Sequence, residues 1–259
     1  MSNNDSFKKT IIVTLLLCIV CSVIVSAAAV LLRPAQVANK SLDVKRNILG
    51  AAGLLEPGTN VEAVFDERVE ARAVDLEQGI FTDAVDPAEY DQRKASKAPE
   101  LSEALSDSED IAKISRREDY SVVYLIKDAN DQLEKIVMPI RGYGLWTTLY
   151  GFLALETDAN TVIGLVFYEH GETPGLGGEV DNPLWKAKWV GKEIYDEQGK
   201  VAITVVKGNA DPASPQAKHQ VDGLSGATLT SRGVHNLLHF WLGESGYKSF
   251  LNNLKNGEA

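Results

Sequence analysis

The chain has 259 residues, of which 44% are hydrophobic and 24% are charged, a composition typical of a globular protein of one or two domains. Its 36 acidic residues outnumber its 26 basic residues and give a formal net charge of -10 at pH 7. This acidic balance argues against nucleic acid, or an anionic bilayer surface, as the partner of the globular part.

The first predicted element is an uncharged apolar segment at residues 11–32. As a helix rising about 1.5 Å per residue, it is long enough to cross a hydrocarbon core of about 30 Å. We predict a transmembrane helix that is retained as an anchor, because the apolar region of a cleaved signal peptide is shorter. Basic residues stand on both sides of the segment, so the charge distribution does not fix its orientation.

Both cysteines, Cys18 and Cys21, lie inside this apolar segment. The rest of the chain therefore forms no disulfide and tolerates either redox compartment. The C-x-x-C spacing is also found in redox pairs and metal half-sites, but no further ligand accompanies it here. We interpret the two residues as small apolar side chains that face lipid or a neighbouring helix.

The region 33–119 is predicted to be a stalk followed by an insert. Residues 41–54 have the apolar spacing of a helix and end at a Glu-Pro-Gly turn, so the transmembrane helix is expected to continue as a stalk. Residues 60–76 have an amphipathic helical period. Residues 91–119 are charged and poor in aromatic side chains, which is typical of a surface excursion or a linker.

The region 120–259 contains strand-like runs separated by turn-rich segments, with few helices between them. Helices are expected at 183–189 and from about Ser231 onward. This order predicts an α+β fold with a largely antiparallel sheet, and no internal repeat is present. The predicted strands are 121–127, 136–140, 149–156, 161–169 and 201–207.

Three segments, 141–151, 169–180 and 222–233, contain more glycine than their predicted elements need. Glycine is required where the backbone takes positive φ or where a ligand approaches the main chain closely. Each segment stands beside the end of a strand or helix. We therefore expect the three segments to border one binding cleft.

The third segment, DGLSGATLTSRG, carries four hydroxyl side chains: Ser225, Thr228, Thr230 and Ser231. A helix is predicted to begin near Thr230 or Ser231, so unsatisfied N–H groups and the positive end of the helix dipole gather there. Such a place binds phosphate. Helix capping by Thr230 or Ser231 is the alternative, although it explains only one of the hydroxyls.

Two other chemistries compete with this phosphate site. The run GLSGA at 223–227 comes close to the nucleophile elbow of hydrolases, with His170 or His235 as base, but no strong strand is predicted before it. His235 and His239 have the spacing of a zinc-binding helix, yet Asn236 replaces the catalytic glutamate and no third ligand is present. We predict no catalytic residue and no metal ligand in this chain.

The chain resembles the C subunits of the Na+-translocating NADH:quinone reductases and, more distantly, the G subunits of Rnf complexes. The resemblance covers nearly the whole chain and includes the apolar anchor and the stalk. Its motifs are GYGLW at 142–146, HGETPGLGGEV at 170–180 and D-x-x-S-G-A-T at 222–228.

The resemblance implies that the last motif is a flavinylation signature, in which Thr228 is joined to FMN through a phosphoester bond. The resemblance also implies that a separate flavin transferase, with FAD as donor, attaches one FMN; the lack of an evident activating base beside Thr228 agrees with this. Two interpretations of Lys207 stay open: it places a positive charge near the flavin, or it is a solvated lysine at the end of a strand. The other implied cofactor-binding residues are Asp222, Ser225, Gly226, Ala227, Glu172, Thr173, Leu176, Gly177, Trp146 and Thr147.

The resemblance also implies a place in a membrane complex. Residues 1–10 would be cytoplasmic, 11–32 would cross the bacterial inner membrane in contact with lipid, and 120–259 would be a periplasmic FMN-binding domain. The chain lacks a dinucleotide fingerprint, so it is expected to carry electrons between other subunits and not to bind NADH itself. An Rnf-type subunit and a membrane-anchored adaptor without redox chemistry remain the alternatives.

Overall fold

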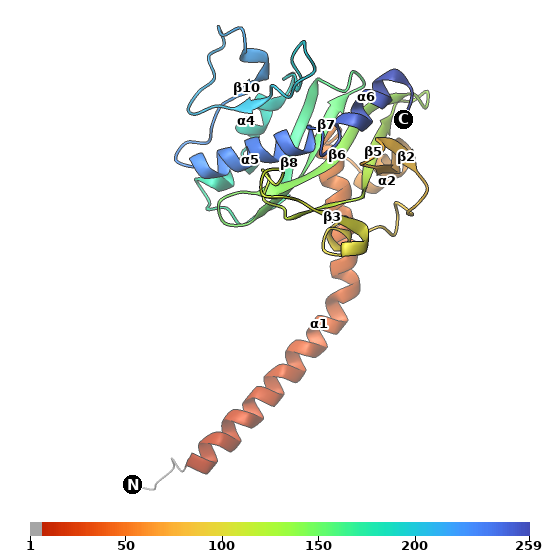
Figure 1. Ribbon diagram of the computed structural model, residues 1–259. Helices are drawn as coiled ribbons and strands as arrows, with labels where there is room; N and C mark the ends of the chain where they lie inside the picture. The colour runs from red at the N-terminus through yellow and green to blue at the C-terminus, as the bar shows by residue number, and fades with distance from the viewer. Residues whose placement is uncertain (1–6) are drawn as a thin grey trace. The chain divides into compact units, whose positions relative to one another are not determined.

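The computed structural model describes residues 7–259, and its contacts divide the chain into two compact units, Met1–Val44 and Lys45–Ala259 (Figure 1). Residues 1–6, most of the predicted N-terminal segment 1–10, lie outside the described residues.

Helix α1, Phe7–Ala51, contains both the predicted transmembrane segment and most of the predicted stalk. Within residues 7–259 it is the helix that is long and apolar enough to cross a membrane, with a mean hydropathy of 3.0 in its most apolar window. The helix ends where Gly53 takes a φ of +69° and the Leu54 N–H donates to Leu49 O at 2.9 Å. A glycine in this conformation is a common helix terminator.

The Lys45–Ala259 unit is built on a six-stranded sheet in the order β2-β1-β5-β6-β7-β8, in which every neighbouring pair is antiparallel. The predicted α+β fold with a mostly antiparallel sheet is confirmed. The strands are β1 (Val69–Asp75), β2 (Ile80–Thr82), β5 (Tyr120–Lys127), β6 (Leu133–Tyr143), β7 (Thr148–Glu156) and β8 (Val162–Glu169).

Helix α5, Thr228–Trp241, packs against one face of this sheet, and α6, Lys248–Asn256, follows it (Figure 1). The face is apolar at alternate positions of β6, such as Ile136 and Met138, as the two-residue period of a strand requires. A Cβ on Gly142 would lie 2.4 Å from the Cβ of Leu237. Glycine at 142 therefore lets α5 approach β6 closely.

The other face of the sheet carries an aromatic row in which Phe152 packs between Tyr124 and Tyr168. The last turn of α1, inside the Lys45–Ala259 unit, contacts β8. The two backbones are so close that a Cβ on Gly164 would lie 2.5 Å from Ala51 O. The sheet is thus a central layer with packing on both faces.

The helix predicted at 60–76 is wrong beyond Arg68. Helix α2 covers only Val61–Arg68, and the chain continues directly into β1, Val69–Asp75. Strand β1 pairs with β5 along its whole length, from Val69 opposite Ile126 to Asp75 opposite Tyr120. Pairing with a distant strand overrides the local helical preference of the sequence.

Residues 91–119 are packed and not an open linker. They form α3 (Gln92–Ala95) and a small hairpin of β3 (Ser102–Ala104) and β4 (Arg116–Glu118). Glu118 is buried and accepts a hydrogen bond from Arg141 Nη2 at 2.7 Å. Residues 45–119 belong to the same compact unit as the sheet, and the assignment of flavin binding to 120–259 stays a prediction.

The predicted helix at 183–189 is confirmed as α4 (Pro183–Lys186) followed by a 3-10 turn (Ala187–Trp189). The strand predicted at 201–207 is reduced to β9 (Thr204–Val205), which pairs in parallel with β10 (Gln220–Val221) outside the main sheet. Helix α5 begins at Thr228, ahead of the predicted start at Ser231. Further 3-10 turns cover Pro99–Leu101, Gly177–Asp181 and Ala217–His219.

Candidate functional site

Thr228 is the first residue of α5 and is exposed. The residue before it, Ala227, gives the helix no side-chain cap. The first N–H groups of α5 therefore lack partners within the helix, and the positive end of its dipole lies at Thr228. Ser225 and Gly226, just before the helix, are also exposed.

Thr230 and Ser231 point into the protein and do not cap the helix, so the predicted capping role is wrong. The Thr230 hydroxyl is fully buried and donates to Glu172 Oε2 at 2.5 Å. Ser231 Oγ accepts a hydrogen bond from the Leu224 N–H at 2.9 Å. Of the four hydroxyls, two thus hold the turn in place and two face outward.

Glu172 connects all three glycine-rich segments. Its carboxylate accepts from Thr230 on one oxygen and, on Oε1, from the N–H groups of Leu145 and Trp146 at 3.0 and 2.9 Å. The residue is only 5% exposed. Burial works to raise the pKa of Glu172, but the bonds from Thr230, Trp146 and Leu145 outweigh it and lower the pKa. Glu172 is therefore an ionised clamp between the segments.

Gly177 leaves the space that this clamp needs. A Cβ at Gly177 would lie 2.5 Å from Thr230 Oγ1 and 2.7 Å from Glu172 Oε2. The side chain of Leu176, the residue before Gly177, contacts the turn that precedes α5. It lies so close that a Cβ on Gly226 would be 2.9 Å from Leu176 Cδ2. The second and third glycine-rich segments thus meet, while the binding cleft that all three are expected to border stays a prediction.

The first segment meets the second through two further bonds. The indole Nε1 of Trp146 donates to Thr173 Oγ1 at 3.1 Å, and the Gly171 N–H donates to Thr147 Oγ1 at 2.6 Å. Large apolar side chains nevertheless face solvent here: Trp146 is 61% exposed and Leu176 is 44% exposed. Exposed apolar surface of this kind is typical of binding sites.

Asp222 anchors the turn through both its side chain and its backbone oxygen. Its carboxylate pairs with Lys188 and accepts from the Ala210 N–H at 2.8 Å, while its backbone oxygen accepts from Trp185 Nε1 at 2.8 Å. Burial works to raise the pKa of Asp222, but the bonds from Lys188 and Ala210 prevail and lower it.

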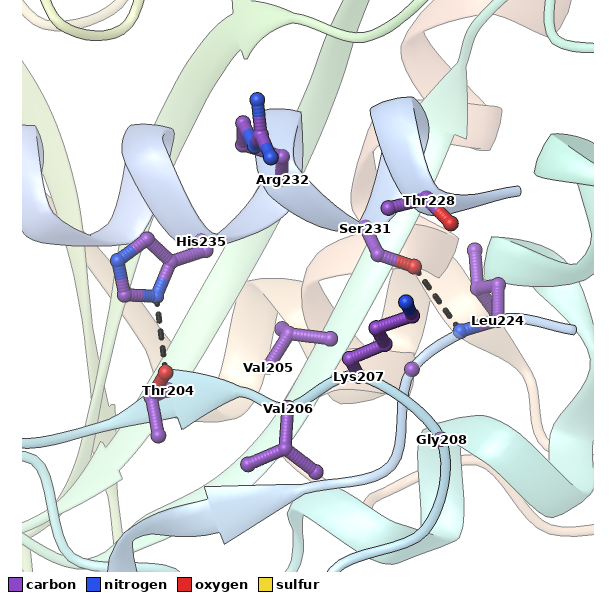
Figure 2. Close-up of a pocket in the computed structure, with 11 residues that line it drawn as sticks. Thr204, Val205, Val206, Lys207, Gly208, Leu224, Thr228, Ser231, Arg232 and His235 are labelled. Atoms are coloured by element: carbon purple, nitrogen blue, oxygen red, sulfur yellow. Dashed lines mark hydrogen bonds between the residues drawn. The ribbon is translucent and has the colours of Figure 1, made fainter. Parts of the chain in front are cut away.

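A cavity of about 260 Å³ opens beside Thr228, between α5 and the segment from Thr204 to Gly208 (Figure 2). Two cations line it, Lys207 and Arg232. Within residues 7–259, neither side chain has a hydrogen bond or an ion pair. The remaining lining residues are Thr204, Val205, Val206, Gly208, Gly223, Leu224, Thr228, Ser231 and His235.

Sequence reasoning missed Arg232. Arg232 lies four residues after Thr228, which places the two on one face of α5. Lys207 is a candidate from the sequence, but nothing in the sequence places it against Thr228. That juxtaposition depends on the β9–β10 pair, which brings 204–208 beside the turn.

The histidines take part in packing contacts. His235 Nδ1 lies 3.1 Å from Thr204 Oγ1, and His239 Nε2 lies 2.8 Å from Ile203 O. Burial, together with the neighbouring His239, lowers the pKa of His235 to about 4. His170 Nε2 lies 2.8 Å from Asp181 Oδ2. A nucleophile elbow requires its serine to be hydrogen-bonded to a base. Neither His170 nor His235 forms such a bond with Ser225.

Comparison with known proteins gives a consistent result. Residues 144–243 match the model of a family described as FMN-binding domain. The chain is 58% identical over 262 aligned residues to the C subunit of the Na(+)-translocating NADH-quinone reductase of Pseudomonas aeruginosa, covering 100% of both chains. It is 51% identical to the protein of the same name from Vibrio alginolyticus, covering 99% of this chain and 98% of that one.

A solved structure is similar as well. The crystal structure of Shewanella oneidensis NqrC superposes with a TM-score of 0.78 at 37% identity, covering 85% of this chain and 99% of that one.

Proposed function

Because this chain belongs to the C-subunit family of the Na(+)-translocating NADH-quinone reductases, we propose that it carries electrons for such a complex through an FMN bound covalently at Thr228. The complex is an oxidoreductase, and this chain acts in it as one subunit beside others. The relatives named above are C subunits of that reductase, which supports this assignment over an Rnf-type subunit.

The observation that carries the covalent bond is the position of Thr228. It is an exposed hydroxyl at an uncapped helix start, while the other two threonine and serine hydroxyls of α5's first turn are buried and engaged. A phosphate joined to Thr228 lies at the positive end of the α5 dipole, a favourable place for an anion. The FMN-binding family match, which includes residue 228, supports FMN as the owner of that phosphate.

Attachment is a transfer of FMN from FAD. Thr228 Oγ forms a bond to the phosphorus of the FMN half, the bond to the phosphate of AMP breaks, and AMP leaves. The hydroxyl proton must go to a base, because an alcohol of ordinary pKa is a poor nucleophile. Within residues 7–259 no base is hydrogen-bonded to Thr228, so we assign that base to a flavin transferase. Asp222, which holds the turn by its backbone and side chain, keeps Thr228 presented to that enzyme.

The residues around Thr228 suit a planar, partly apolar ring. Leu176 and Trp146 supply exposed apolar surface, Gly177 permits close approach, and Thr173 and Thr147 supply polar atoms at the edge. Bound FMN supplies one- and two-electron transfer, and the protein sets its position and surroundings. Glu172 acts mainly through the loops it holds, because both of its oxygens already accept protein donors.

We further propose the arrangement in the membrane. Helix α1 is a single anchor in the bacterial inner membrane, in contact with lipid, and the flavin-binding region 120–259 lies on the periplasmic side. Covalent attachment suits that location. A tethered FMN does not dissociate, and FMN lost on the periplasmic side would not be replaced from the cytoplasmic FMN pool.

Intact-mass measurement tests the covalent bond. The full-length chain is coexpressed with a flavin transferase, purified in detergent and denatured. We expect one added FMN residue and ultraviolet-excited fluorescence of the denatured band, both absent from Thr228→Ala. A chain of unmodified mass would refute the proposal.

Ser225→Ala is the matched control, because Ser225 is the other exposed hydroxyl of the same turn. Peptide mapping of the wild type should place the flavin on Thr228. Flavin found on Ser225 would mean that the acceptor has been assigned wrongly. Accessibility of an engineered cysteine near the C-terminus to a membrane-impermeant reagent tests the periplasmic side.

A further inference from the structure

We propose that Lys207 and Arg232 form the phosphate-recognition pair of this protein: they attract the phosphate of FMN to Thr228 and offset its charge. The inference rests on the proposed function and extends it by two residues. It also assigns a function to the cavity beside Thr228: binding a phosphorylated flavin in preference to an uncharged one.

Both cations line one cavity, with the Arg232 side chain directed away from Lys207 and Thr228 in Figure 2. Thr228, Lys207 and Arg232 line the same cavity, and Figure 2 shows the Lys207 amine directed toward Ser231 and Thr228. A phosphate esterified to Thr228 Oγ is held one bond from that oxygen. The anion therefore stays at the cavity wall, within the reach of a lysine side chain.

The charges point to an anionic ligand. Thirteen other ion pairs and the Lys188–Asp222 pair engage many cations of the chain, yet within the described residues 7–259 no acid pairs with either lining cation. Asp222, the nearest acid along the turn, is held by Lys188 and Ala210. In a chain of net charge -10, two cations left together beside the acceptor threonine match a phosphate.

The cavity wall is shaped for this approach. A Cβ on Gly223 would lie 2.4 Å from Val206 O, so only glycine lets the turn lie against the segment that carries Lys207. The Gly223 N–H donates to Gly208 O at 2.8 Å and locks the two segments together. These contacts fix the backbone on both sides of Lys207 against the turn that precedes Thr228.

The test uses the full-length chain, made without a flavin transferase and purified in detergent, titrated separately with FMN and with riboflavin. The two probes differ only in the phosphate. We expect FMN to bind more tightly than riboflavin. Lys207→Gln and Arg232→Gln should each weaken FMN about fivefold, the range of an exposed charged contact, and leave riboflavin unchanged.

Raising the salt concentration should reduce the preference for FMN in the wild type, because exposed charges are screened. Lys97→Gln is the control, since Lys97 is an exposed lysine that does not line the cavity. Equal affinity for the two probes, equal weakening of both, or no detectable FMN binding overturns the inference.

Intact mass after coexpression with the transferase separates the two proposals. If the flavin is attached but the variants bind FMN as the wild type does, the phosphate pair is wrong and the covalent site stands. If no flavin is attached, the proposed function itself has failed.

Discussion

Two sides of the site differ: on the Glu172 side the carboxylate is buried and accepts hydrogen bonds on both oxygens, whereas on the cavity side Lys207 and Arg232 line an open cavity beside Thr228 without partners among residues 7–259. On the first side, the charged group is bonded to other groups of the same chain. On the second, Lys207 and Arg232 are solvated charges that can meet a ligand.

This difference separates the residues that build the site from those that await the cofactor. Charged groups that are buried must be paired, because an unpaired one costs several kcal/mol. Exposed cations carry no such cost and are free to meet a ligand. Substitutions on the Glu172 side should therefore change stability, and substitutions on the cavity side should change ligand binding with little effect on stability.

The largest effect is expected for Glu172→Ala. The change leaves the buried Thr230 hydroxyl and the N–H groups of Leu145 and Trp146 without an acceptor. We expect a loss of about 3 kcal/mol in the free energy of unfolding, measured by denaturant titration of the full-length chain in detergent.

Glu172→Gln serves as the control, because its amide oxygen still accepts a hydrogen bond; it should cost less than the alanine variant. The ionised carboxylate stabilises the fold only while it is charged. Since the folded pKa lies below the usual value of 4.5, the contribution is present above pH 4.5 and lost as the pH falls through the folded pKa. A stability gap between wild type and Glu172→Ala that did not narrow in acid would contradict the clamp.

Gly177→Ala should have the next largest effect. The added Cβ meets Thr230 Oγ1 at 2.5 Å and Glu172 Oε2 at 2.7 Å, so one of the two must move and their hydrogen bond is strained. Crowding of a packed site costs about 2 kcal/mol, measured in the same titration. Gly178→Ala is the control, because its Cβ approaches no atom closer than 3.1 Å. Equal losses in the two variants would show that the effect is not specific to the clamp.

Ser231→Ala tests whether the cavity side also contains a structural residue. Its hydroxyl accepts from the buried Leu224 N–H, which would lose its partner. We expect a loss of about 1 kcal/mol in the free energy of unfolding. Thr228→Ala, at an exposed hydroxyl of the same helix, should stay within about 0.5 kcal/mol of the wild type. A Thr228→Ala protein as unstable as Ser231→Ala would remove the distinction between building and binding hydroxyls.

Four strands of the sheet could be predicted from the sequence because their apolar residues are dictated by a buried face, as in 149–156. Strand β1 could not, because VEARAVD contains good helix formers and becomes a strand only by pairing with β5. Its preference is local, while its partner lies some fifty residues away in the chain.

The site shows the same limit. The glycine-rich segments and the hydroxyl-rich turn are evident from residue types alone. The uses of the hydroxyls are not, because Thr230 and Ser231 look like helix caps until their partners, Glu172 and Leu224, are brought to them by tertiary contacts. The role proposed for Lys207 likewise depends on the cavity that it lines together with Arg232, which the sequence alone does not show.

The smallest effect at neutral pH is expected at His235, in the lining of the cavity, because its ring is neutral there in both the folded and the unfolded chain. Burial, with the neighbouring His239, lowers the pKa of His235 to about 4. The neutral ring is therefore the form that the folded protein favours. Its contribution to stability is complete above the usual pKa of 6.5 and is lost as the pH falls through 6.5 toward 4. Nuclear magnetic resonance of the histidine rings in the full-length chain should show one ring titrating near pH 4.

The His235→Asn variant should lose that titration. This result sharpens the comparison, because a neutral His235 leaves Lys207 and Arg232 as the charged residues of the cavity lining at pH 7. If His235 instead titrates near 6.5, it adds a third positive charge in mild acid. The preference for FMN over riboflavin would then increase as the pH falls through 6.5, and Lys207 and Arg232 would not account for it alone.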